Sequence, residues 1–324
     1  MKHTSKLALF MAAGMVSAGA QAADFEVGED TVLTLGGEVV LNYVSEDAVG
    51  SDSTTEFKDD GSIVVLGGER DLGNGYTAYI ETEFAYDTLG ESGDGFDRDA
   101  SVFGFTGDFG EIQAGDSDNV FEDVIMDAID PFENATLSQV EVTDEDSMIT
   151  YYSPDMQGFS YRLQTRVKDE NDGRQTGNEA SLIAAAQYDF GNFALSAGYD
   201  DRGSMDTGGG TRFESEDEVY GFAATAGLSD NLEASFRYAQ QSNKNGDDVD
   251  ASGAALVYNY GAGDLYGAVQ DYSPTSGDSR TQLAGGVNYG LADGLLIFAE
   301  YGNFDGVSSG DDDKLAVAGL ILEY

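Results

Sequence analysis

Alternation of apolar and polar residues at every second position constrains the fold most strongly, because it recurs along almost the whole 324-residue chain. It is clearest in residues 33–43, 76–86, 159–167 and 232–238. Aromatic and aliphatic side chains occupy one face of each segment, and Glu, Arg, Gln, Ser and Thr occupy the other. A period of two predicts strands, and the charges predict that the second face meets water.

The connections between these segments come in two sizes that alternate strictly. Short turns rich in Gly, Asn and Asp lie at 71–75, 107–110, 153–155, 190–192, 228–231, 261–263 and 291–294. Such residues supply the positive φ of tight hairpins. Longer acidic stretches lie at 44–60, 87–97, 116–147, 168–178, 200–217, 241–250, 272–280 and 303–313. These fifteen connections predict sixteen strands, with a margin of two because the registers near 63–69 and 251–260 are ambiguous.

The two ends of the chain predict its compartment. Residues 1–22 have the three parts of a secretory signal peptide, which are basic Lys2 and Lys6, an apolar stretch, and a small-x-small cleavage site that ends at Ala22. The apolar stretch is too short for a membrane anchor. Residues 320–324 form an alternating strand that ends on an aromatic residue. We therefore expect a mature domain of residues 23–324.

An exported chain of alternating strands, with no apolar run of transmembrane-helix length, is typical of a bacterial outer-membrane β-barrel. The predicted fold class is all-β, a sixteen-stranded antiparallel barrel with short periplasmic turns and long outer loops. Sixteen strands leave a water-filled interior, whereas eight would be filled by side chains. The predicted location is the outer membrane, which the chain crosses many times.

The composition excludes much catalytic chemistry. The chain has no Cys, and its single His is His3, which lies in the predicted signal peptide. The mature chain would therefore lack thiol chemistry, disulfides and imidazole-based nucleophilic or metal sites. We expect neither an enzyme nor a cofactor.

Acidic residues dominate the charge, with 61 Asp and Glu against 15 Lys and Arg and a formal net charge of −46. Adaptation to a salty habitat is one explanation and an electrostatic filter for cations is another. The spread of acid along the whole chain favours the first, and both can hold. Phosphate repulsion excludes nucleic acid as a partner. Acid runs such as Asp247-Asp248 and residues 311–313 resemble calcium ligands only loosely, so Ca²⁺ or Mg²⁺ is expected as a loose ligand of outer loops.

Four stretches in order along the chain resemble the general bacterial (Gram-negative) porin family. They are GGERDLGNG at 67–75, SVFGFTGDFGEIQAG at 101–115, SMITYYSPDMQGF at 147–159, and the terminal aromatic Tyr324, where Phe is more usual. The resemblance implies a homotrimer of sixteen-stranded barrels in lipid and lipopolysaccharide. It also implies insertion by the barrel-assembly machinery through the C-terminal strand. A third loop that folds inward would set acidic residues against basic residues of the wall.

This chain departs from that pattern where the family places arginine. Asp116 follows the glycine of the strand before the third loop, and the acidic run 144–146 replaces an arginine at the far end of that loop. Arg98 lies one residue out of step with a third family arginine. The basic wall therefore lacks some of the arginines of the family pattern, and the chain resembles an acidic, halophile-like variant of the family.

Residues 116–147 are the candidate constriction, because this longest connection holds eleven acidic residues and no Lys or Arg. Its apolar residues would pin it against the inner wall, whereas a solvated outer loop is the alternative. Asp127, Asp130 and Glu133, which flank Pro131, are the candidate pore-facing acids.

Two further groups lie on polar strand faces. Arg162, Arg166 and Lys168 share one face and are the candidate basic wall, with charge balance away from the narrowest point as the alternative. Glu81 and Glu83 share another and are candidate pore-lining acids. A general acid and base pair is the alternative for these two, but no cleft motif accompanies them.

The function expected from these features is passive diffusion of ions and small hydrophilic solutes, with a preference for cations. The alternative is a substrate-specific outer-membrane channel with a solute-binding site in its lumen. A soluble, secreted acidic β-protein or adhesin is a third hypothesis, against which the alternation of turns and loops argues.

Overall fold

The computed structural model describes residues 22–48, 52–90, 96–167, 180–202, 217–244, 246–305 and 312–324. Most of the predicted signal peptide, together with Lys168, lies outside these ranges. Among the described residues, no helix combines the length and apolar character that crossing a membrane would need. Apart from two short helical turns, the regular structure described is β-strand, as the period-two pattern predicts.

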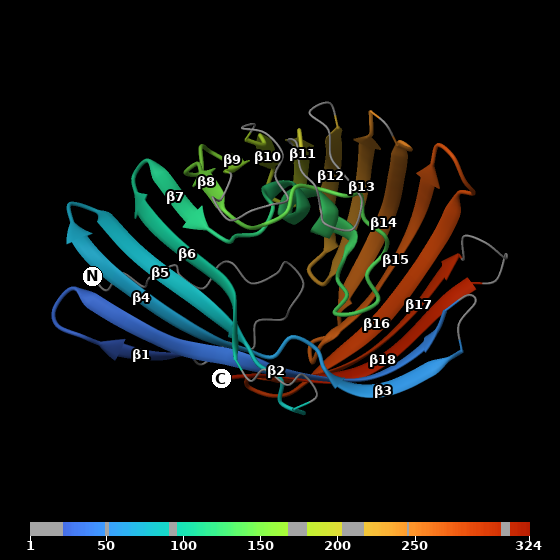
Figure 1. Ribbon diagram of the computed structural model, residues 1–324, viewed down its shortest axis with the longest axis horizontal. Helices are drawn as coiled ribbons and strands as arrows, with labels where there is room; N and C mark the ends of the chain where they lie inside the picture. The colour runs from blue at the N-terminus through green and yellow to red at the C-terminus, as the bar shows by residue number, and fades with distance from the viewer. Residues whose placement is uncertain are drawn as a thin grey trace.

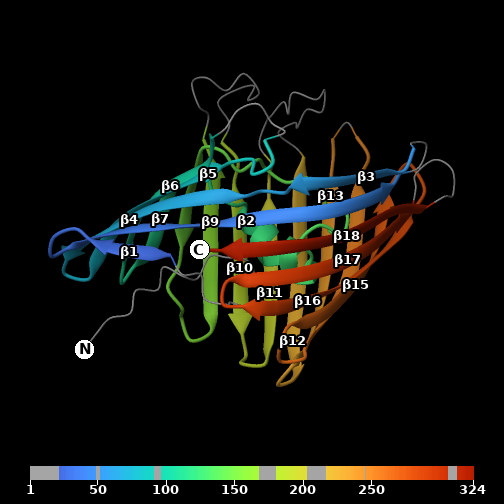
Figure 2. The same ribbon diagram turned by 90° about the horizontal axis from the view of Figure 1, so that it is seen from below.

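The strands form one antiparallel sheet that closes on itself (Figures 1 and 2). They are β1 (Ala23–Glu26), β2 (Thr31–Asp47), β3 (Thr54–Asp59), β4 (Ile63–Gly73), β5 (Tyr76–Ala85), β6 (Asp97–Gly107), β7 (Gly110–Gly115), β8 (Met148–Tyr152), β9 (Phe159–Arg166), β10 (Ile183–Asp189), β11 (Phe193–Asp200), β12 (Glu218–Ser229), β13 (Leu232–Ser242), β14 (Val249–Asn259), β15 (Asp264–Pro274), β16 (Arg280–Ala292), β17 (Leu295–Asp305) and β18 (Asp312–Glu323).

Eighteen segments make sixteen barrel strands, because two strands are built from two pieces each. β1 pairs with residues 32–35 of β2 and continues the line of β18, which pairs with residues 38–47 of β2. β3 and β4 likewise follow each other along the opposite edge of β2. The predicted sixteen-stranded barrel is confirmed, and the ambiguous segment near 63–69 is the second piece of a broken strand.

The barrel closes at the C-terminal residue. Tyr324 and Gly37 exchange two backbone hydrogen bonds, each 3.0 Å long. The last strand is thus hydrogen-bonded to the first long strand along its length, and no edge remains there. Closure satisfies the backbone groups that a bilayer could not.

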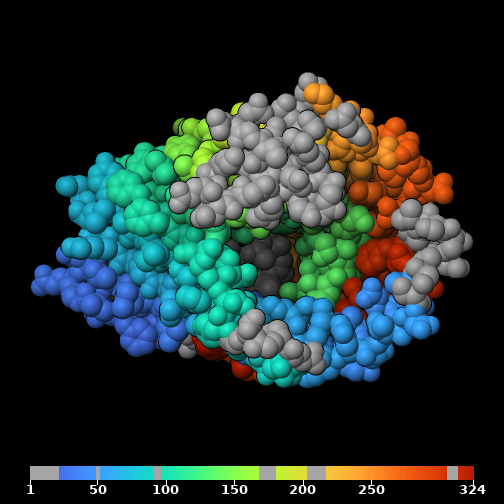
Figure 3. Space-filling model, viewed as in Figure 1, coloured from blue at the N-terminus to red at the C-terminus, as the bar shows by residue number. Residues whose placement is uncertain are grey.

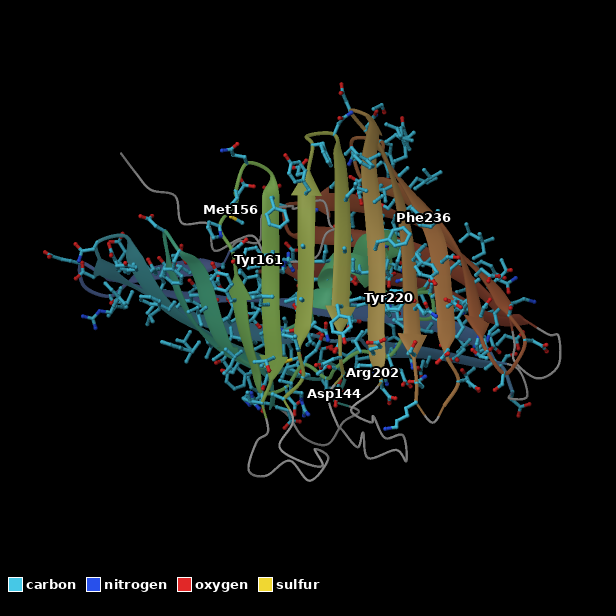
Figure 4. All side chains as sticks on the ribbon, turned by 90° about the horizontal axis from the view of Figure 1, so that it is seen from above. Asp144, Met156, Tyr161, Arg202, Tyr220 and Phe236 are labelled. Carbon is cyan, nitrogen blue, oxygen red and sulfur yellow. The ribbon has the colours of Figure 1, made fainter. Side chains whose placement is uncertain are left out.

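The two faces of the wall differ as the sequence pattern predicts. On β13, Phe236 is 41% exposed on the outside, whereas the neighbouring Arg237 is 1% exposed on the inside. Figure 4 shows Tyr161, Tyr220 and Phe236 on the outer surface of the strands. An apolar exterior and a polar interior suit a barrel that is surrounded by lipid and filled with water.

The connections follow the predicted rhythm of short and long. The short turns include those between β4 and β5, β6 and β7, and β16 and β17. Met156 lies at the turn end of the barrel, and Asp144 and Arg202 lie at the opposite end (Figure 4). The predicted loop 168–178 and parts of 44–60, 87–97, 200–217, 241–250 and 303–313 lie outside the described residues. The prediction of one long loop over 44–60 is wrong, because β2 continues to Asp47 and β3 occupies residues 54–59.

The connection between β7 and β8 lies inside the barrel rather than beyond its rim (Figure 1). It contains the π-helical turn η1 (Glu122–Met126) and the 3-10 turn η2 (Asp127–Ile129). Apolar side chains of this segment are fully buried and form two clusters with the inner wall, among them Val120, Phe121, Ile125, Met126, Ile129, Ala135, Leu137 and Val140. The main apolar core of this barrel is therefore the contact between the loop and the wall.

Candidate functional site

The loop 116–147, called the third loop from here on, rests on a row of small residues in the wall. Ala185, Gly198, Gly221, Ala239 and Ala251 are directly opposite one another across β10 to β14. We call these five residues the small-residue seat. Its members contain no side chain beyond a methyl group, so the loop approaches the wall closely there.

The two glycines of the seat lie directly under the loop. A Cβ atom at Gly198 would lie 2.7 Å from Phe121 and 2.9 Å from Ile125. One at Gly221 would lie 2.8 Å from Ile125 and 3.1 Å from Phe121. Real side chains essentially do not pack at such distances, so glycine is required for this seating of the loop.

Polar side chains of the wall hold the backbone of the loop. Glu300 on β17 accepts hydrogen bonds from the backbone N–H groups of Glu133 (2.8 Å), Asn134 and Ala135 (both 2.9 Å). Amide side chains do the same elsewhere, with Gln164 accepting from Val120, Gln241 from Glu141 and Gln282 from Ser138. These bonds satisfy backbone donors that the loop would otherwise bury without partners.

Arg237 also holds the loop rather than facing open water. Its Nη1 donates to the backbone carbonyl of Met126 at 2.6 Å, and its Nη2 donates to Gln270. Met126 is the last residue of η1, where carbonyl groups lack partners within the helix. The charge of Arg237 therefore stabilises the end of η1 within the loop.

The predicted basic wall is paired with acids of the third loop. Arg162 Nη1 lies 2.7 Å from Asp123 Oδ2 and its guanidinium covers the ring of Tyr152 at 5.6 Å. Arg166 is 1% exposed and its Nη2 lies 2.5 Å from Asp146 Oδ1. The structure thus places Arg162 beside the passage and Arg166 beneath the far end of the loop. Their role as a pore wall stays a prediction, as does that of Lys168, which is not described.

The predicted pore-facing acids lie on η2 and the turn that follows it. Burial raises the pKa of Asp127 and Glu133 to about 7 and that of Asp130 to about 6, and neighbouring carboxylates add to the shift at Asp127 and Glu133. Two acids of η1 that the sequence analysis did not single out also have raised pKa values. Burial raises the pKa of Glu122 to about 7 and that of Asp123 to about 6. These five residues form what we call the loop acid cluster.

Acids of the opposite wall approach the same space. Glu81 and Glu83 on β5 line a recess of about 120 Å³ together with Asp118, Asp123 and Tyr152. Figure 3 shows the molecule hollowed between the green third loop and the cyan and blue wall facing it. The predicted acids of β5 and acids of the loop therefore border one recess.

Acids of the wall also influence an acid farther along the loop. Burial is the largest cause of the raised pKa of Glu133, and the charges of Glu300, Glu38, Asp130 and Asp60 raise it further. Glu38 belongs to β2 and Asp60 follows β3, so both come from the wall. Acid thus lies on the wall side as well as the loop side.

Several basic residues of the wall and the loops form ion pairs with acids. Ion pairs among the described residues include those of Lys58 with Asp60, Arg98 with Asp116, Arg162 with Asp123, Arg166 with Asp146 and Arg202 with Glu141. Asp116 takes the place of one arginine of the family pattern, and Asp146 belongs to the acidic run that replaces another. Both are ion-pair partners of arginines at other positions, Arg98 and Arg166. Negative charge exceeds positive charge around the passage.

Sequence reasoning missed the anchors of the loop. Glu300, Gln164, Gln241, Gln270 and Gln282 lie on the polar faces of strands, so their inward direction was readable. Which segment they would meet was not readable, because period two reports a face and not the partner on that face.

A family model supplies the observation that decides the family. The model described as Gram-negative porin matches residues 8–309. The chain belongs to the Gram-negative porin family. The family resemblance seen in the motifs is therefore confirmed, and the protein is an outer-membrane β-barrel.

The relatives of this porin are outer-membrane proteins. A "Monosaccharide porin" of Halomonas sp and a "Major outer membrane protein" of Halomonas elongata are each 29% identical over 307 residues, covering 86% of this chain and 81% of the relative. The major outer membrane protein P.IA of Neisseria meningitidis is 33% identical over 116 residues, 34% of this chain and 30% of that protein.

Solved structures share the fold. An anion-selective porin from Comamonas acidovorans superposes with a TM-score of 0.72 at 18% identity, covering 91% of this chain and all of that one. A loop L8 deletion mutant of OmpT of Vibrio cholerae has a TM-score of 0.70 at 19% identity, with the same coverage. At such identities the likeness concerns the barrel and not its selectivity.

Proposed function

We propose that this porin is a water-filled channel for passive diffusion of ions and small hydrophilic solutes, and that it prefers cations. One observation carries the proposal, namely the presence of acid on both sides of the passage. The third loop supplies Asp118 and the loop acid cluster, and the wall supplies Glu38, Glu81 and Glu83. No catalytic group is needed for such a role.

Electrostatics turns this arrangement into selectivity. Carboxylates on facing surfaces add their potentials in the space between them, whereas an acid opposite a base would cancel. Low-dielectric walls focus this field along the passage, which raises the local concentration of cations. We propose that the third loop narrows the passage at this level, so that permeating ions pass within reach of both groups.

A charge-neutralising variant tests the contribution of the wall. We expect Glu81→Gln combined with Glu83→Gln to lower the ratio of K⁺ to Cl⁻ permeability, because two of the facing carboxylates disappear. The matched control is Glu233→Gln, which removes an exposed acid near the turn end of β13. Equal permeability ratios in the double variant and the unmodified porin would contradict a role for the β5 acids.

A substrate-specific channel is the second candidate function. It is favoured by the similarity to the monosaccharide porin of Halomonas sp and by the recess, which adds Gln113, Ser101 and Tyr152 to its carboxylates. Amide, hydroxyl and aromatic groups are suited to sugars. Concentration-dependent, saturable block of the ion current by glucose would favour this function, and a linear dependence of flux on glucose would favour simple diffusion.

We further propose that the porin is a homotrimer in contact with lipid and lipopolysaccharide, made after removal of residues 1–22. A solved structure of Vibrio cholerae OmpT is a trimer form, which supports the oligomer by analogy of fold. The Halomonas relatives support adaptation to salt as a second use of the acid. Migration in detergent gels before and after boiling tests the trimer, and N-terminal sequencing tests the cleavage.

A further inference from the structure

We propose that Asp200, the last residue of β11, is a latch that joins the two ends of the third loop and so keeps the passage at one width. It acts as a positioning residue, since it touches the loop and not the permeating ion. The inference rests on the proposed function, in which the third loop narrows the passage.

Four hydrogen bonds converge on this carboxylate. Asp200 Oδ2 accepts from the backbone N–H of Thr143 (2.7 Å) and from Asn119 Nδ2 (3.2 Å). Its Oδ1 accepts from Thr143 Oγ1 and from the backbone N–H of Arg202, both at 2.7 Å. Asp200, Asn119 and Thr143 are all fully buried. Charge-assisted bonds of this kind are stronger than neutral ones.

The two loop residues come from opposite ends of the segment. Asn119 lies a few residues after β7, and Thr143 lies a few residues before β8. Asn119 Nδ2 also donates to the carbonyl of Thr143 at 2.9 Å, so the two limbs touch each other as well as Asp200. The carboxylate therefore connects both limbs of the loop to the end of β11.

Arg202 strengthens the latch from the side of the strand. Its backbone has a φ of +53°, a left-handed conformation that is uncommon for a residue other than glycine. This bend directs its N–H back to Asp200, while its guanidinium reaches Glu141 of the loop at 3.0 Å and Asn243 at 2.9 Å.

The other wall anchors each hold one stretch. Glu300 binds residues 133–135, and Gln282 binds Ser138. Within the described hydrogen bonds, Asp200 is the wall side chain that contacts both limbs. Loss of another anchor would loosen one stretch, whereas loss of Asp200 would release both limbs from the wall at this point and leave only the direct bonds between them.

Asp200→Asn is the sharpest probe of this latch. The variant keeps the shape, but whichever way the amide turns, its NH₂ group meets an N–H donor, from Thr143 or from Arg202. We expect the population of displaced loop states to rise at least about tenfold, which corresponds to about 1.4 kcal/mol. In planar bilayers the full-length porin carrying this change should show at least that rise in current fluctuations and should close at lower voltage.

The ion selectivity of the variant distinguishes the specific loss of the latch from a general loss of structure. The loop acid cluster is intact in the variant, so the K⁺ to Cl⁻ permeability ratio of its open state should stay that of the unmodified porin. Asp264→Asn is the matched control, because Asp264 is also buried at a strand end, on β15, but bonds to Asn259 rather than to the loop. Its current noise should equal that of the unmodified porin.

Asn119→Ala provides a second route if Asp200→Asn fails to assemble, since it removes the side-chain bonds of Asn119 to Thr143 and Asp200 and leaves the other bonds of Asp200. The double variant should show little more current noise than Asp200→Asn alone, because both changes break the same connection between the limbs and the wall. Quiet currents and an unchanged closing voltage in either folded variant would overturn the latch. Anion selectivity in the unmodified porin would instead overturn the proposed function.

Discussion

Individual carboxylates of the loop are the residues whose state changes most easily with conditions. Burial and mutual repulsion raise the pKa of Glu122, Asp127 and Glu133 to about 7. The pKa of Asp123 and Asp130 is about 6. These acids are charged at pH 8 and become neutral as the pH falls through 7 and 6.

Cation preference should therefore decline as the pH is lowered. The sign follows because an acid with a raised pKa loses its negative charge on the acidic side of that pKa, so about five negative charges leave the loop between pH 8 and pH 5. Reversal potentials measured at fixed KCl gradients across this range check the expectation. A permeability ratio that is flat over this range would show that the cluster does not face the permeating ions.

The two predicted arginines should differ in their effect on selectivity. Arg162→Gln removes a partly exposed partner of Asp123 and should strengthen cation preference, although such a pair contributes only about 0.2–1 kcal/mol to stability. Arg166→Gln removes a buried partner of Asp146 and should lower the unfolding temperature while leaving selectivity nearly unchanged. The opposite assignment would place Arg166, and not Arg162, at the narrowest point.

At the scale of elements, the fit between the third loop and the small-residue seat determines where the loop lies. Gly221→Ala would bring a methyl group to within 2.8 Å of Ile125 and 2.7 Å of the backbone oxygen of Tyr238. Overpacking of this kind costs typically about 1–3 kcal/mol. We expect a lower unfolding temperature and a changed single-channel conductance, because the loop must move into the passage.

Gly285→Ala is the control for that prediction. It makes the same change on β16, where the nearest atom to the added Cβ would be 3.6 Å away, at the backbone oxygen of Tyr266. This variant should keep the native conductance. Equal conductance in both variants would show that the seat does not position the loop.

The elements also show what the sequence can and cannot predict. Strands, turns and the third loop followed from period two, from Gly and Asn at tight turns, and from one long apolar-containing connection. The anchors did not follow, because Arg166, Arg237 and Asp200 meet residues distant in sequence. Periodicity identifies inward positions, but the identity of the facing group depends on closure of the whole barrel.

The interrupted strand illustrates the same limit. Residues 54–59 and 63–73 belong to one barrel strand, but the break between them made the register ambiguous in the sequence. Gly61 has a φ of +96°, and Asp60 N–H bonds to the carbonyl of Val40 across the gap. Such a break is decided by pairing with β2, which local propensity does not report.

At the scale of the whole molecule, the central claim is that acid on the loop and acid on the wall act together on ions in the passage. Screening sets the range of that action, since the Debye length is about 10 Å at 0.1 M salt and about 3 Å at 1 M. Selectivity that arises from this field must therefore weaken as salt increases, whereas selectivity by size would not.

The most direct test is the reversal potential of the unmodified porin in planar bilayers under a KCl gradient, measured at low and at high mean salt at pH 8. We predict a cation-selective potential near 0.1 M that fades towards about 1 M as the screening length contracts. An anion-selective potential at low salt would contradict the account, because it would mean that positive charge governs the narrowest part of the passage.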